Sequence, residues 1–146
     1  IYEKITEDRF VMITPNTPGY VKLHEQGVWG KELLNKPLIF RENGSGTQKL
    51  IDNYLGSMNV TEDNLNIVAY VSSSQLQKDL VKMGTGVAIL SEYSTRDLVS
   101  SGRVLRFEME RNCLSRNIYM AKDKKGILNS LALEFDKFVK SNFKLN

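Results

Sequence analysis

Two turns rich in hydroxyl groups are the part of this sequence best suited to chemistry. "GSGTQK" at 44–49 contains Ser45, Gly46 and Thr47, and "VSSSQLQK" at 71–78 contains Ser72 to Ser74. Each turn follows a short apolar run and precedes a helical pattern. Hydroxyl donors and the free N–H groups of a helix N-terminus together favour a small anion such as sulfate, phosphate or a carboxylate.

Each turn also has a purely structural interpretation. Ser45 with Gln48, and Ser72 with Gln75, have the three-residue spacing of a capping box. Either turn alone could therefore be no more than a well-capped helix start. The functional interpretation depends on the two turns lying side by side.

Other kinds of site find little support in the sequence. "GSGTQK" has neither the spacing of G-x-x-x-x-G-K-[ST] nor the third glycine of G-x-G-x-x-G, so nucleotide binding is not expected. With one histidine, His24, and one cysteine, Cys113, we expect no disulfide, metal cluster or Ser-His or Cys-His catalytic pair. Glu42 lies near the first turn, where a carboxylate would repel an anionic substrate, so we do not expect an enzyme.

Composition indicates one ordinary globular domain. The chain has 146 residues, 41% of them hydrophobic and 25% charged, and a net charge of +3. Its densest basic run, "KDKK" at 122–125, is interpreted as a solvated turn, so these residues are not expected to contact nucleic acid. No stretch approaches the ~20 apolar residues that a membrane-spanning helix needs.

The order of the expected elements places the two turns together. Apolar runs predict strands at 9–15, 37–41, 65–71, 86–90, 103–107 and 116–121. Helical periodicity predicts helices at 47–58, 74–83, 94–102 and 128–142. One short helical turn is expected between 16 and 36. The β-α-β-α-β order from 37 to 90 predicts a parallel sheet, and both turns would then lie at its carboxyl edge, where open α/β folds bind ligands.

Longer phrases of the sequence resemble a known family. They are "PLIFRENGSGTQKLIDNYL", "LNIVAYVSSSQLQKDLVKMGTGVAILS", "LVSSGRVLRF" and "SRNIYMAKDKKGILNSLALEFDKFV". In order and distance these phrases are similar to the effector-binding domain of LysR-type transcriptional regulators. The resemblance covers nearly the whole chain and implies a domain truncated at its amino end.

The resemblance implies an α/β fold of the type II periplasmic-binding-protein kind, with a parallel-core sheet flanked by helices. Two lobes would be joined by two crossovers, and the ligand would bind in the cleft between them. Residues 1–16 would hold the end of lobe I and the first crossover, 17–112 would form lobe II, and 113–146 would hold the second crossover and a helix returning to lobe I.

The family's binding residues can be carried over to this sequence. Its Ser-Gly-Thr turn falls on Ser45, Gly46 and Thr47, and its second helix cap falls on Ser73 with Ser74 beside it. Arg41 matches a frequent family arginine that either lines the cleft or caps the strand end. Thr17 and Ser91 depart from the family's frequent histidine and proline, which affects the hinge and not the anion site.

We therefore expect a cytoplasmic effector-sensing domain that binds a small anionic ligand, an oxyanion or a carboxylate, without a cofactor or a membrane. The family also implies self-association as a dimer or tetramer, and DNA contact only through a helix-turn-helix domain absent from this chain. The alternative is an extracytoplasmic solute-binding protein for a small oxyanion. A transferase on the same fold is a third and weaker possibility.

Overall fold

The computed structural model describes residues 1–111, 114–124, 126 and 129–143. The chain forms two compact units. The larger unit is Arg9–Leu114, and the smaller unit combines Ile1–Asp8 with Ser115–Asn146. Each unit is described by itself.

The larger unit is built on a mixed sheet. Its strands are β1 (Tyr2–Pro15, from Arg9 onward), β2 (Leu38–Arg41), β3 (Ile67–Val71), β4 (Ala88–Ser91) and β5 (Val104–Glu108). β2 pairs with β3 in parallel, and a parallel bridge joins Leu38 of β2 to Val87 beside β4. The predicted parallel arrangement of 37–90 is thus confirmed. β1 runs antiparallel to both β4 and β5, and the Leu38 bridge links this antiparallel sheet to the two-stranded parallel sheet of β2 and β3, so the linked sheet is mixed.

Helices follow the strands as the sequence predicts. They are α1 (Pro18–Glu25), α2 (Gly46–Ser57), α3 (Ser74–Lys82) and α4 (Glu92–Ser100), with short 3-10 turns η1 (Gly30–Leu33) and η2 (Glu62–Asn64). The connection from 16 to 36 was expected to hold one short helical turn, which was wrong. It contains α1 as well as η1, because Pro18 at the first position after Thr17 presets the helical backbone. Within the described residues, no helix has both the length and the apolar character to cross a membrane.

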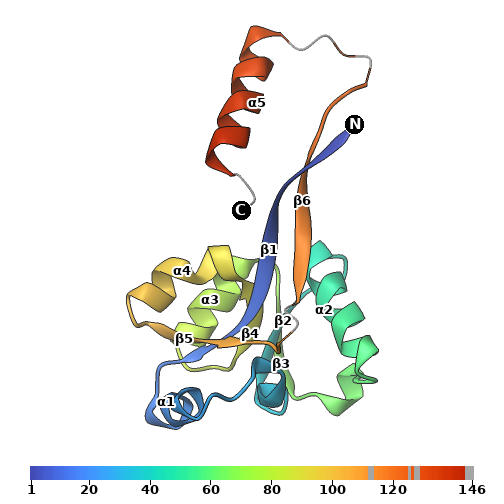
Figure 1. Ribbon diagram of the computed structural model, residues 1–146. Coiled ribbons are helices and arrows are strands. Elements are labelled where there is room, and N and C mark those ends of the chain that lie inside the picture. The colour runs from blue at the N-terminus through green and yellow to red at the C-terminus, as the bar shows by residue number, and fades with distance from the viewer. Residues whose placement is uncertain (112–113, 125, 127–128, 144–146) are drawn as a thin grey trace. The chain divides into compact units, whose positions relative to one another are not determined.

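The sheet separates two layers of core, because successive side chains of a strand point to opposite faces. Phe10 and Met12 of β1 belong to one core, whereas Val11 and Ile13 belong to the other. Ile51 and Leu55 of α2 join the first core, and Val81 of α3 with Leu98 and Val99 of α4 joins the second. Figure 1 accordingly shows α2 on one side of the sheet and α3 and α4 on the other.

The smaller unit is held by pairing between distant parts of the chain. The beginning of β1 pairs with β6 (Ser115–Ala121), and helix α5 (Ser130–Asn142) follows. β1 begins at Tyr2, earlier than the predicted strand at 9–15. The predicted strand at 116–121 and the closing helix are confirmed, although α5 starts at Ser130, where the Asn129 side chain accepts a hydrogen bond from the Ala132 N–H at 2.9 Å. Residues 127–128 and Cys113 lie outside the described residues.

Alternating charges link the three elements of the smaller unit. Lys122 after β6 contacts Glu3 of β1 at 3.1 Å and also contacts Asp136 of α5. Lys140 contacts Glu3 at 3.2 Å and Asp136 at 3.0 Å. The hydrogen bonds from Lys122 and then Lys140 hold the pKa of both carboxyl groups below their ordinary values.

These ion pairs predict a pH dependence of the smaller unit. A carboxyl group whose pKa is lowered by folding stabilises the fold above its unfolded pKa, and this stabilisation is lost as the pH falls through the folded pKa. We expect α5 to lose stability as the pH falls below about 4, the ordinary pKa range of these carboxyl groups, and Asp136→Asn to lack much of that dependence. Urea unfolding followed by circular dichroism at several pH values would test this. Asp63→Asn in η2 is the control, and an equal effect of both substitutions would contradict the prediction.

Candidate functional site

The two hydroxyl-rich turns stand at the ends of neighbouring strands. Ser45 precedes α2, which follows β2, and Ser73 precedes α3, which follows β3. Because β2 and β3 are parallel, with Arg41 opposite Val71, both turns leave the same edge of the sheet. The structure therefore brings the two turns together, as the sequence predicts.

Each turn is capped by a single serine. The Ser45 hydroxyl accepts a hydrogen bond from the Gln48 N–H at 3.4 Å, and the Ser73 hydroxyl accepts one from the Leu76 N–H at 3.1 Å. Gly44 has φ of 94°, a conformation that favours glycine, so the chain can reverse direction before Ser45. Neither capping box is complete. Ser73 caps α3 in place of Ser72, and the Gln48 side chain bonds elsewhere.

Arg41, at the end of β2, contacts the second turn. Its guanidinium group donates to the Ser74 hydroxyl at 3.3 Å and to the Ser72 carbonyl oxygen at 3.1 Å, and it also contacts the Glu42 carboxylate. The Arg41 side chain is only 17% exposed. It thus places a positive charge beside the start of α3. Arg41 was expected either to line the cleft or to cap the strand end, and here it links the end of β2 to the residue that follows β3.

Two buried glutamines fasten the helices of the site to β2, and sequence reasoning did not assign them to it. The Gln48 side chain accepts a hydrogen bond from the Arg41 N–H at 2.9 Å and donates to Asp52 at 2.8 Å. The Gln77 side chain of α3 donates to the Ile39 carbonyl oxygen at 2.9 Å. Their exposed fractions are 2% and 0%. The signal was available, because each glutamine stands three residues after a serine of its turn.

A small hollow lies beside the first turn. It has a volume of about 220 Å³, and it is lined by Asn43, Gly44, Ser45, Gly46, Gln48, Lys49 and Asp52. Ser45 and Gly46 are the predicted site residues among these. Lys49 is a cation that the sequence prediction did not include. Thr47, Ser73, Ser74 and Arg41 do not line the hollow, so the structure does not gather all predicted site residues into one cavity.

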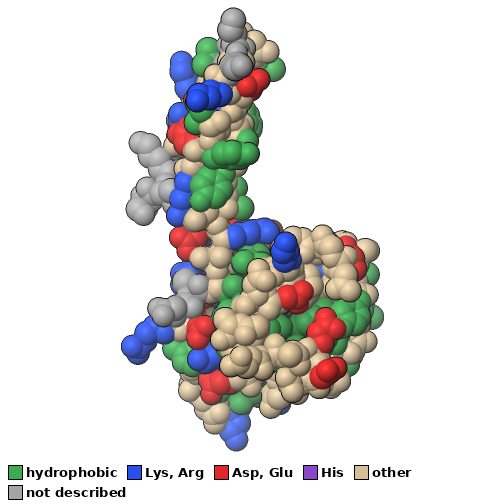
Figure 2. Space-filling view, turned by 90° about the vertical axis from the view of Figure 1, so that its right-hand side faces the viewer, with side chains coloured by type: hydrophobic (Ala, Val, Ile, Leu, Met, Phe, Trp, Pro, Cys, Tyr) green, Lys and Arg blue, Asp and Glu red, His purple; other side chains and the backbone are tan. Residues whose placement is uncertain are grey.

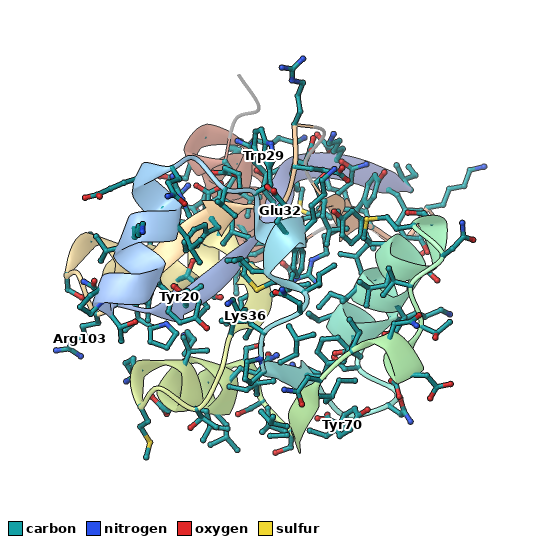
Figure 3. All side chains as sticks on the ribbon, turned by 90° about the horizontal axis from the view of Figure 1, so that it is seen from below. Tyr20, Trp29, Glu32, Lys36, Tyr70 and Arg103 are labelled. Carbon is teal, nitrogen blue, oxygen red and sulfur yellow. The ribbon has the colours of Figure 1, made fainter. Side chains whose placement is uncertain are left out.

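A larger groove of about 610 Å³ runs along β5 and is lined by none of the predicted site residues. His24 and Trp29 contribute to it, and the His24 ring meets the Phe107 ring edge-on at 5.2 Å. Figure 3 shows Trp29 and Tyr70 on opposite sides of the larger unit.

His24 is exposed, as predicted. Over the residues that the structure describes, no group of His, Cys, Asp and Glu could hold a metal ion.

Comparison with known proteins identifies the family. Residues 1–144 match the profile described as the LysR substrate binding domain. The chain belongs to this family. The predicted family is thereby confirmed, and the match favours a regulator's effector-binding domain over the alternative solute-binding protein. This domain family is not a family of enzymes.

Relatives of this LysR-family chain are longer proteins. It is 29% identical over 129 residues to the HTH-type transcriptional activator CmpR of Synechocystis sp., which covers 88% of this chain and 41% of CmpR. It is also 29% identical over 138 residues to the uncharacterized HTH-type transcriptional regulator MJ0300 of Methanocaldococcus jannaschii, covering 94% of this chain and 46% of that protein. The chain thus spans less than half the length of these two relatives.

Solved structures of LysR effector-binding domains share the fold. The regulatory domain of CcmR from Synechocystis, in complex with 2-PG, has a TM-score of 0.81 and 18% identity. The effector binding domain of QuiR, in complex with shikimate, has a TM-score of 0.73 and 21% identity. Each match covers 99% of this chain and 67% of the other. The predicted periplasmic-binding-protein-like fold is confirmed.

The role of Gln48 in positioning the first turn can be tested by its removal. Gln48→Ala leaves the partly buried Arg41 N–H without its side-chain partner, so we expect a loss of about 1–3 kcal/mol in the free energy of unfolding. Gln75→Ala removes an exposed glutamine of α3 and should change that free energy by no more than about 0.5 kcal/mol. Urea titration measures both, and similar small effects would argue against a fastening role for Gln48.

Proposed function

We propose that this domain senses a small anionic effector, an oxyanion or a carboxylate, on behalf of a LysR-type DNA-binding regulator. The observation that carries the proposal is the pair of neighbouring helix N-termini, α2 and α3, with the Arg41 guanidinium against the start of α3. Helix N-termini and a guanidinium all favour negative charge, and here they meet at one sheet edge. Ser45, Gly46, Thr47, Ser73 and Ser74 would supply hydrogen-bond donors to the ligand.

The known ligands of structural neighbours support a small molecule. CcmR was solved with 2-PG and QuiR with shikimate, and shikimate carries a carboxylate. At under 25% identity these neighbours do not indicate which ligand this chain binds. The chemistry of its own turns favours a ligand whose oxygens accept several hydrogen bonds, and an inorganic oxyanion or an organic carboxylate meets this requirement.

The ligand would bind in a cleft between two lobes. In this proposal 17–112 form lobe II, 1–16 and 113–146 supply the crossovers and part of lobe I, and further residues of the full-length protein complete lobe I. Exposed apolar side chains in the smaller unit support the last point, because such surface is usually covered. They include Leu131, Phe135 and Phe138 of α5, and Figure 2 shows hydrophobic side chains on the surface of this unit.

Sensing would work by a shift between two arrangements of the lobes. An anion that contacts both lobes binds the closed arrangement more tightly and so increases its population. The change would alter the packing of subunits and the presentation of DNA-binding domains that lie outside this chain. Because the target is DNA, we propose that the full-length protein acts in the cytoplasm.

A thermal-shift screen of the full-length protein with sulfate, phosphate, shikimate and 2-PG tests the site. We expect at least one of these ligands to raise the melting temperature, because a ligand that binds only the folded state stabilises it. Thr47→Ala and Ser73→Ala should each weaken its binding by about tenfold or more, since each removes a hydrogen bond to a charged group.

The ligand-induced shift, and not the melting temperature itself, is the quantity to compare. Ser73→Ala also removes the cap of α3, which costs about 0.5–2 kcal/mol without any ligand. Ser57→Ala at the opposite end of α2 is the control and should leave the ligand-induced shift intact. Full ligand effects in both Thr47→Ala and Ser73→Ala would contradict the proposed site.

We also propose that the domain self-associates through β3. In the described part of the chain β3 has β2 as its strand partner, so its other edge is open. Val68 and Tyr70 on this strand are 46% and 51% exposed. An open edge with apolar side chains favours association with another chain, and a second copy is the partner that the family implies.

Sedimentation of the full-length protein tests this surface. Val68→Lys places a charge on the open edge and should raise the dissociation constant by about tenfold or more. Tyr93→Lys on α4 is the control, because Tyr93 is similarly exposed, at 48%, but does not lie on β3. Unchanged association in Val68→Lys would exclude β3 as the interface.

A further inference from the structure

Glu42 contacts the anion-binding face of Arg41. Its carboxylate accepts from Nη2 of Arg41 at 3.3 Å and from Nε at 3.5 Å. This side of the guanidinium group, with two parallel N–H donors, is the one that arginine offers to carboxylates and oxyanions. Glu42 thus takes the place that two oxygens of a bound anion would take.

The contact between Glu42 and Arg41 is weak. Both distances exceed the roughly 2.7–2.9 Å of a strong charge-assisted hydrogen bond. The Glu42 side chain is 46% exposed, whereas the Arg41 side chain is 17% exposed. Exposed ion pairs contribute little to stability, so the Glu42 carboxylate can move from Arg41 into water at a small cost in free energy.

The remaining partners of Arg41 cannot leave so easily. Ser72 contributes a backbone carbonyl oxygen, and Ser74 contributes a hydroxyl from the first turn of α3. The backbone of Glu42 is itself held, because its N–H donates to Val71 at 3.1 Å and its carbonyl oxygen accepts from Ser45 at 3.3 Å. Only the side chain of Glu42 is therefore positioned to move when an anion arrives.

We propose that Glu42 is an internal counter-ion of the effector site, which an incoming anion displaces from Arg41. This inference rests on the proposed function, because it concerns the same site. Glu42 then determines specificity: a ligand binds only if it competes with a carboxylate for the two N–H donors. Ligands that present two oxygens to the guanidinium group are favoured over those that present one.

The charge of Glu42 supports its role as a competitor. The hydrogen bond from Arg41 holds the pKa of the Glu42 carboxyl below its ordinary value. At neutral pH the group is therefore ionised and neutralises Arg41 until a ligand takes its place. A repulsive carboxylate near an anion site, which the sequence alone presents as an obstacle, becomes in this arrangement an exchangeable partner.

Binding measurements on the full-length protein test the displacement. Sulfate, phosphate, shikimate and 2-PG are titrated into wild type, Glu42→Gln, Glu42→Asp, Arg41→Gln and the control Glu25→Gln at the end of α1. Glu42→Gln removes the competing charge and should tighten the binding of whichever of these anions binds by about two- to fivefold. Glu42→Asp keeps the charge but is one methylene shorter, so it should tighten binding as well. Melting without ligand confirms that each variant folds.

The outcomes separate the inference from the proposed function. If none of the four anions binds the wild type, the proposed function fails and the inference fails with it. If an anion binds and Arg41→Gln weakens it, but Glu42→Gln binds it no more tightly than wild type or Glu25→Gln, the site stands and the displacement is wrong. Tighter binding by Glu42→Gln with unchanged binding by Glu42→Asp would indicate simple repulsion and would also overturn the displacement.

Discussion

The position of β2 is the constraint on which the site depends. Leu38, Ile39 and Phe40 are almost completely buried, and their side chains enter both cores of the larger unit. Parallel pairing with β3 and the bridge to Val87 hold the strand on both edges. A strand held in this way cannot shift without disrupting the packing on both faces of the sheet.

The helices of the site are fastened to the backbone of this same strand. Gln48 binds it from α2 at the Arg41 N–H, and Gln77 binds it from α3 at the Ile39 carbonyl oxygen. The N-termini of α2 and α3 are therefore fixed relative to each other through β2. Hydrogen-bond donors on two helix N-termini held in this way lose little conformational freedom when they bind a ligand. More of the interaction free energy therefore remains as binding affinity.

Local patterns in the sequence were sufficient for the elements that form the site. The apolar runs around Phe40 and Ile89 are too short for helices and too continuous for exposed strands, which predicts buried parallel strands. The serine and glycine residues of the turns likewise mark helix starts. A family resemblance then supplied the fold, and the comparisons confirm it.

Features that depend on distant contacts were beyond the sequence. The stretch from Tyr2 to Asp8 contains many charged residues, and it becomes a strand because β6, more than a hundred residues later, pairs with it. The antiparallel pairing of β1 and the hydrogen bonds of Gln77 are decided by which elements pack together. The pairing of Glu42 with Arg41 joins adjacent residues, but it depends on side-chain conformations that the structure shows and the sequence does not.

Rigid and exchangeable parts of the site have different consequences for sensing. A ligand shifts an equilibrium only through contacts that differ between the two states. The donors on α2 and α3 are fixed by β2, so in the proposed mechanism they contribute similarly to both arrangements of the lobes. The difference in ligand affinity between the two arrangements must then come from groups that change partners. Glu42, which belongs to lobe II in the proposed division of the chain, would be such a group. In this proposal the ligand would replace the Glu42 carboxylate at Arg41, and the same exchange that sets specificity would also help to set the coupling.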